Sequence, residues 1–126
     1  MYSDFDIKII DSAFDPDLES KKPKKIYYNN VGEKTVYKVW IFLEGKSLPY
    51  IKDVTYILHP TFADPIKTIS RSSKNPRCKL EIWTWGLFQL RVKIRNKKGE
   101  VFEKTHNLTY NRDFPISKDD FEPFRS

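Results

Sequence analysis

Hydrophobic and polar residues alternate along several short stretches of the chain, as in β-strands that bury one face. The clearest stretch is 88–95, where every second residue is apolar. The alternation recurs at 5–9, 54–58 and 78–82, and residues 101–110 and, more weakly, 24–28 are further strand candidates. No stretch keeps a helical period of 3.6 residues, so the pattern predicts an all-β protein with negligible helix.

Two further segments refine this prediction. Residues 36–43 are almost continuously apolar, which is typical of a central strand that is buried on both faces. The polar loop 96–100 contains Gly99 near its end, which suits the left-handed position of a β-hairpin. Short strands separated by Pro, Gly and Asn predict a β-sandwich of about eight strands.

Length and composition fit one domain. The chain has 126 residues, of which 39% are hydrophobic and 15% aromatic, enough for a packed core. We expect residues 1–126 to form a single sandwich domain with a C-terminal tail at 111–126. The phenylalanines of this tail either dock on the sandwich or form a partner-binding strip.

Charge is unevenly distributed. The net charge is +6, but residues 21–112 alone carry 20 basic and seven acidic side chains, while both ends are acidic. On the strand 88–95, alternate residues Arg91, Lys93 and Arg95 would lie about 6.6 Å apart, close to the spacing of nucleic-acid phosphates. This basic stripe could bind a polyanion such as nucleic acid or a phospholipid head group. The stripe could equally be a charged outer face of the sheet that is in contact with water and binds nothing.

The residues suited to catalysis are few. The chain has two histidines and one cysteine, with neither metal-ligand spacing nor a glycine-rich phosphate loop. Cys78 falls at an apolar position of an alternating stretch, so we expect a buried, inert thiol. The sequence therefore predicts a protein that is not an enzyme and that needs neither metal nor cofactor.

The single cysteine excludes an intramolecular disulfide, the first 20 residues lack a signal-peptide pattern, and no apolar run reaches the ~20 residues of a membrane span. We expect a cytoplasmic protein without a membrane span.

Two loops carry a family resemblance. The first is Leu58-His59-Pro60-Thr61-Phe62, and the second is Trp83-Thr84-Trp85-Gly86-Leu87-Phe88. With the strand 37–45, which ends at Gly45, they resemble over roughly residues 35–110 the YEATS domain, and most nearly its prokaryotic relatives. That family is an immunoglobulin-like β-sandwich known as a reader of acylated lysine. Thr84 stands where the family usually has glycine, and Thr35 or Val36 stands where it has a third aromatic wall.

The resemblance implies a ligand-binding site made of His59, Thr61, Phe62, Trp85 and Gly86. Phe62 and Trp85 would form two walls around the acyl group, and Thr61 would hydrogen-bond its amide. The backbone N–H of Trp85 would donate to the amide carbonyl, Gly86 would permit close approach, and His59 would fix the loop. The same aromatic residues could instead fill the end of the core.

Three functions therefore stay open. The first is a non-enzymatic binding module for an acylated peptide or protein. The second is a protein-protein interaction module whose pocket is vestigial, acting in a larger prokaryotic complex. The third is a polyanion binder that uses the basic stripe.

Overall fold

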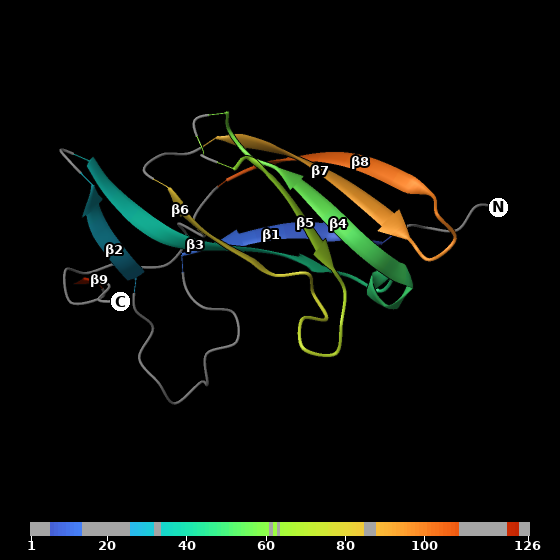
Figure 1. The fold of residues 1–126 in the computed structure, drawn as a ribbon. Coiled ribbons are helices and arrows are strands. Elements are labelled where there is room, and N and C mark those ends of the chain that lie inside the picture. The colour runs from blue at the N-terminus through green and yellow to red at the C-terminus, as the bar shows by residue number, and fades with distance from the viewer. Residues whose placement is uncertain are drawn as a thin grey trace.

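The described part of the protein is a sandwich of two β-sheets (Figure 1). The computed structural model describes residues 6–13, 26–31, 34–60, 62, 64–84, 88–108 and 121–123. These contain one three-residue 3₁₀ helix, Leu48–Tyr50, and nine strands: β1 Lys8–Ser12, β2 Ile26–Val31, β3 Lys34–Glu44, β4 Ile51–Ile57, β5 Ile66–Ser70, β6 Leu80–Thr84, β7 Gln89–Asn96, β8 Val101–Asn107 and β9 Phe121–Pro123. The all-β prediction is confirmed.

The first sheet is organised around β3. The second half of β3 pairs antiparallel with β1, and its first half pairs antiparallel with β2. Strand β6 pairs with residues 37–41. Trp40 and Ile41 pair with both β1 and β6, so these two strands lie on opposite edges of β3. Strand β9 adds to β2 in parallel, which docks this part of the C-terminal tail on the sheet.

The second sheet is a four-stranded antiparallel sheet in the order β5-β4-β7-β8. The predicted hairpin between β7 and β8 is present. Gly99 has a φ of 89°, and the Asn96 side chain accepts hydrogen bonds from the backbone N–H groups of Lys98 and Glu100. Strand β5 was not predicted, because its residues alternate between half-buried and exposed and give little apolar signal.

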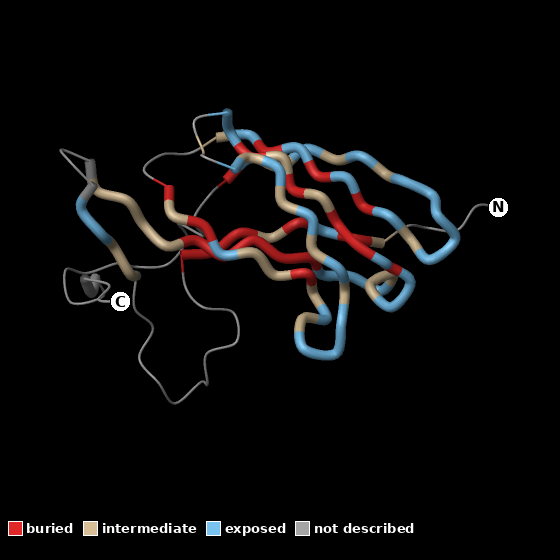
Figure 2. The backbone as a smooth tube through the Cα atoms, viewed as in Figure 1, coloured by how far each residue is buried: buried red, intermediate tan, exposed pale blue. Residues whose placement is uncertain are grey.

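The core lies between the sheets, where buried positions of both layers face one another (Figure 2). Nine of the residues that the alternation and the continuous apolar run place in the core are buried: Val39, Trp40, Phe42, Val54, Leu58, Ile82, Leu90, Val92 and Ile94. Leu80, which the alternation at 78–82 also places in the core, is partly buried against them. The prediction that 36–43 is buried on both faces holds for its second half, residues 39–43.

Cys78 requires a correction. It is buried, as predicted, but it lies in the loop before β6 and has a φ of 51°, so it is not a strand residue. Its backbone carbonyl accepts a 2.7 Å hydrogen bond from the buried hydroxyl of Tyr56 on β4. The loop is thus connected to the second sheet through the core.

Polar side chains also connect the sheets along the β1–β8 side. A ring nitrogen (Nε2) of His106 on β8 lies 2.6 Å from the carboxylate of Asp11, which is almost fully buried on β1. Two residues before His106 on the same strand, Lys104 donates a 3.1 Å hydrogen bond to the Ile7 carbonyl. These contacts satisfy polar groups that would otherwise be desolvated without partners.

Gly45 ends β3 in a position that only glycine can occupy without strain. Its φ is 140°, and an added Cβ would lie 2.1 Å from the Asp6 carbonyl oxygen. The close approach is fixed by hydrogen bonds from Ser47 N to Asp6 O and from Asp6 N to Ser47 Oγ, at 3.1 and 2.9 Å. The turn after β3 therefore holds the beginning of β1.

We predict that Gly45→Ala lowers the free energy of unfolding by about 3 kcal/mol, because backbone strain and a backbone clash add. Gly99→Ala is the matched control. Gly99 also has a positive φ, but nothing lies within 4 Å of an added Cβ. Its cost should be about 1–2 kcal/mol. Equal costs in urea titrations would contradict the close approach at Gly45.

A second pair of variants tests the alternation on β7. Leu90 is fully buried, so Leu90→Ala should cost about 2–4 kcal/mol through lost transfer energy and a cavity. The adjacent Arg91 is exposed, with its side chain in an ion pair to Glu103. Arg91→Ala should cost less than about 1 kcal/mol. A cost at Arg91 that equals the cost at Leu90, again by urea titration, would be incompatible with this register.

Candidate functional site

The topology brings the two loops of the sequence motif to one end of the sandwich. Strand β4 of the second sheet ends at Ile57, and the loop with His59 and Phe62 follows directly. Strand β6 of the first sheet ends at Thr84 and β7 of the second sheet begins at Gln89, so the chain passes from one sheet to the other between these two strands. Figure 1 shows the end of β6 and the start of β7 at the same end of the sandwich as the end of β4.

Phe88, just before β7, contacts the aromatic residues of the first loop. Its ring centroid lies 6.2 Å from that of His59 in an edge-to-face arrangement, and 5.5 Å from that of Phe62. Phe62 and Phe88 are half-buried and pack on the core, whereas His59 is exposed. These aromatic contacts join the two loops at their bases.

Backbone hydrogen bonds shape the same region. The Phe62 N–H donates to the His59 carbonyl at 3.0 Å, which closes a tight turn, and the Leu58 N–H donates to the Pro65 carbonyl at 2.7 Å, which closes the base of the loop. Phe88 is itself anchored, because its carbonyl accepts a 3.1 Å bond from Leu108 N–H. The loop geometry therefore depends on the strands that flank it.

Three predicted site residues, Thr61, Trp85 and Gly86, lie outside the described residues. It remains a prediction that Thr61 hydrogen-bonds the amide, that Trp85 forms the second wall and that Gly86 permits close approach. Of the predicted site, the structure describes His59 and Phe62, and it places both against Phe88. Phe88 was recognised as part of the motif but not as a site residue; its place at the end of the second loop was the available signal.

The structure describes two positions at which the chain departs from the family pattern. Thr84, where the family usually has glycine, is the buried last residue of β6 and pairs with Tyr37. A side chain is therefore accommodated before the second loop. Thr35, which with Val36 is one of the two residues at the expected place of a third aromatic wall, pairs with Asn30 of β2. Its hydroxyl donates a 3.1 Å hydrogen bond to Asn30 Oδ1.

A comparison with known families agrees with this geometry. The sequence model of the prokaryotic YEATS domain matches residues 37–109, which is more than half of the chain and includes both loops. The chain belongs to this family.

Solved structures support the same immunoglobulin-like fold. They include the YEATS domain of Yaf9, from yeast, at 20% identity and a TM-score of 0.55, with 86% of this chain and 73% of that chain covered. The Yaf9 YEATS domain recognising an H3K122suc peptide is 21% identical at a TM-score of 0.53, with 86% of this chain and 72% of that chain covered. The same domain bound to H3K27ac is 19% identical at a TM-score of 0.52, with 91% of this chain and 81% of that chain covered. No curated protein matches. At these identities the structural likeness shows the fold alone.

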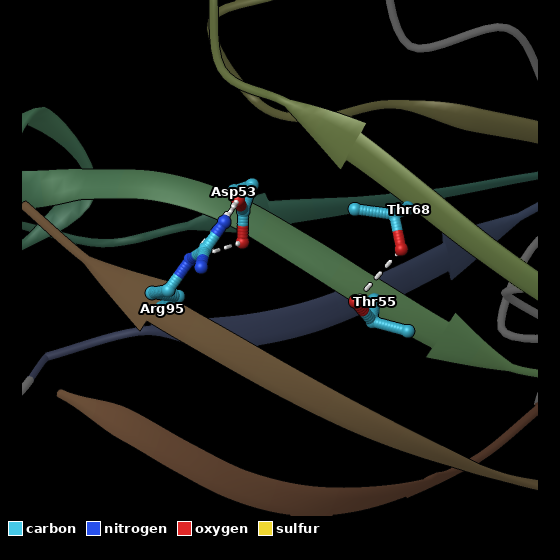
Figure 3. A network of polar contacts seen from close by, with 4 residues as sticks. All are labelled: Asp53, Thr55, Thr68 and Arg95. Atoms are coloured by element: carbon cyan, nitrogen blue, oxygen red, sulfur yellow. Dashed lines mark hydrogen bonds and ion pairs between the residues drawn. The ribbon is translucent and has the colours of Figure 1, made fainter. Parts of the chain in front are cut away.

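The basic stripe lies on the outer face of the second sheet of this YEATS domain, where much of its charge is paired. Arg91 Nε lies 2.8 Å from Glu103 Oε1 on β8, and Arg95 forms a bidentate pair with Asp53 on β4 (Figure 3). The hydrogen bond that Arg91 donates lowers the pKa of Glu103, and the hydrogen bonds that Arg95 donates to the Asp53 carboxylate raise the pKa of Arg95. Lys93 lies opposite Glu103 in the register of β7 and β8.

Catalytic and metal chemistry gain no support from the described residues. Burial raises the pKa of the Cys78 thiol to about 11, so the thiol is protonated near neutral pH and is a poor nucleophile. No group of three His, Cys, Asp or Glu side chains in this part of the YEATS domain is arranged to hold a metal ion. No helix among the same residues is long and apolar enough to cross a membrane.

The ion pairs give the polyanion hypothesis a quantitative test. Three free cations would give a slope of about −2.7 in log K against log salt with duplex DNA, whereas one would give about −0.9. Because Arg91 and Arg95 are paired, we expect a slope near −0.9 or no binding at all. The measurement is fluorescence anisotropy at several salt concentrations. Binding with a steep slope that disappears in the Arg91, Lys93 and Arg95→Glu triple variant would establish the stripe as a polyanion site.

Proposed function

We propose that this YEATS domain is a non-enzymatic binding module that holds an acylated lysine between its two motif loops. His59, Thr61 and Phe62 come from the first loop, and Trp85 and Gly86 from the second. The observation that carries the proposal is the packing of His59 and Phe62 against Phe88, because it brings the bases of both loops together.

The chemistry of the ligand matches these residue types. An acylated lysine has a flat, neutral amide on a long aliphatic stem, so it needs apolar walls and a few well-placed donors and acceptors. Phe62 is half-buried and packs against the core, so its ring is held in place and can form one wall. Trp85 supplies the second wall, Thr61 the hydroxyl for the amide, and the Trp85 backbone N–H the donor for its carbonyl.

The relatives support this ligand class. The Yaf9 YEATS domain has been solved with H3K122suc and H3K27ac peptides, which carry succinyl and acetyl modifications. Histone tails themselves suit this chain less well, since its net charge of +6 repels basic sequences. We therefore infer an acylated peptide or protein whose flanking residues are neutral or acidic.

The test is isothermal titration with an uncharged peptide that contains one acetyl-lysine, and with the same peptide unmodified. We expect a dissociation constant of about 0.1–1 mM for the acetylated form, or about −4 to −5.5 kcal/mol. Binding of the unmodified peptide should be at least about tenfold weaker, because a buried ammonium loses its hydration without gaining a partner.

Two variants and a control locate the binding. Trp85→Ala and Phe62→Ala should each abolish measurable binding. Tyr50→Ala should leave it unchanged, because Tyr50 is an aromatic residue with 67% exposure that precedes β4, at the strand end opposite the motif loops. No preference for the acetylated peptide would reject the proposal and favour an interaction module with a vestigial pocket.

A further inference from the structure

Four exposed lysines lie near Tyr50, at the end of the sandwich opposite the motif loops. Tyr50 directly precedes β4, and the first motif loop follows the other end of that strand (Figure 1). Lys46 and Lys52 flank Tyr50 in the chain, and Lys97 and Lys98 lie in the turn between β7 and β8. We call these four lysines and Tyr50 the tyrosine–lysine patch.

Backbone hydrogen bonds bring the two segments of the patch together. The Lys97 N–H donates to the Tyr50 carbonyl at 2.9 Å, which joins the β7–β8 turn to the segment before β4. The turn that contains Lys46 is closed by a 3.3 Å bond from the Leu48 N–H to the Gly45 carbonyl. Segments 45–50 and 96–100, which are distant in the sequence, therefore lie side by side.

A register shift at the start of β4 places Lys52 in this patch. Ile51 pairs with Asn96 and Asp53 pairs with Arg95, so Lys52 is one extra residue on β4, as in a β-bulge. Bulges redirect side chains and are frequent beside functional sites. Here Ile51 is buried in the core while Lys52 is exposed. The shift thus adds a cation to the patch without disturbing the core.

The four lysines differ from other cations of the protein because they lack ion pairs. Elsewhere in the described part of the chain, five cations pair with a carboxylate: Lys38, Lys67, Arg77, Arg91 and Arg95. None of the patch lysines forms such a pair with a described residue. Glu100, the acidic residue of the β7–β8 turn, accepts a 3.0 Å hydrogen bond from the Asn96 side chain. Even with Glu100 counted, the patch presents a net positive charge to water.

Tyr50 adds a flat apolar surface to these charges. Its side chain is 67% exposed, so the ring is accessible to a ligand. Exposed aromatic rings among cations are the combination that binds single-stranded nucleic acid, because the cations attract phosphates and an unstacked base packs on the ring. A duplex offers the same phosphates, but its bases are stacked on one another. The patch therefore suits a single strand better than a duplex.

We propose that the tyrosine–lysine patch binds single-stranded nucleic acid, with one base stacked on Tyr50 and neighbouring phosphates on the lysines. Every base has a flat face, so this binding has little sequence preference. The patch is separate from the proposed acyl-lysine site, because the seven residues of β4 between them span about 23 Å. One molecule can therefore hold a nucleic acid at one end and a modified peptide at the other.

The experiment measures the fluorescence anisotropy of a labelled oligo-dT of about ten nucleotides, within the range of known single-strand sites, at several salt concentrations. Contacts from four lysines should give a slope of about −2.8 in log K against log salt. A duplex of the same length should bind at least about tenfold more weakly, because its bases cannot stack on Tyr50.

Variants separate stacking from charge. Tyr50→Ala should weaken oligo-dT binding about tenfold without changing the slope, and Tyr50→Phe, which keeps the ring, should stay within about threefold of the unchanged protein. The Lys97 and Lys98→Gln double variant should reduce the slope to about −1.4. Lys93→Gln is the matched control. Lys93 is an exposed lysine on the outer face of the second sheet, so its replacement should change neither the affinity nor the slope.

Three results would overturn the nucleic-acid proposal. They are no binding of oligo-dT, binding that Tyr50→Ala leaves unchanged, and a loss in Lys93→Gln as large as in the lysine double variant. Vesicles of phosphatidylcholine and phosphatidylserine in equal parts test a lipid surface as the ligand. If they bind the protein more tightly than oligo-dT does, the patch is a membrane contact and the proposal is rejected. The acetyl-lysine titrations are independent of all these outcomes.

Discussion

The structure depends on the burial of β3 on both of its faces. Val39, Ile41 and Leu43 fill the core, while Trp40 and Phe42 on the opposite face are also almost fully buried. Charged side chains cover part of those rings: Lys38 lies 5.4 Å from the Trp40 ring and Arg77 lies 4.8 Å from the Phe42 ring, where the aliphatic stems and the cations both favour an aromatic partner. Because β1, β2 and β6 all pair with β3, this one strand sets the register of the first sheet. Strands β2 and β6 take their positions from it.

A hydrophobic core alone would not fix how the two sheets are placed relative to each other, since apolar contacts are not directional. Directional contacts between the layers include two that involve buried groups. The Tyr56 hydroxyl bonds the Cys78 carbonyl inside the core, and Asp11 meets His106 at the side where β1 and β8 approach. Removing one partner from such a contact leaves a desolvated polar group, which costs more than the bond itself contributes. These contacts therefore favour one arrangement of the sheets over others with similar apolar burial.

Strand alternation was sufficient to predict the fold class, most of the core and the hairpin at Gly99, because each depends on local side-chain pattern and turn chemistry. It was not sufficient for β5 or β9. Strand β5 is an edge strand whose side chains are all half-buried or exposed, and β9 is three residues long. Such strands are held by backbone pairing, β5 with the preceding β4 and β9 with the distant β2, and this pairing leaves little trace in the sequence. Cys78 shows the same limit. The alternation at 78–82 predicts a strand residue there, but Cys78 lies in a buried loop that is fixed by the long-range hydrogen bond from Tyr56.

The candidate site shows which part of a binding site the sequence can predict. The motif identified His59 and Phe62, and the family places them in a site, but Phe88 links the loops only because β6 and β7 belong to different sheets. Because β6 ends and β7 begins at the end of the sandwich where β4 also ends, Phe88 meets the loop that follows β4 there. The meeting of the loops is thus a consequence of topology.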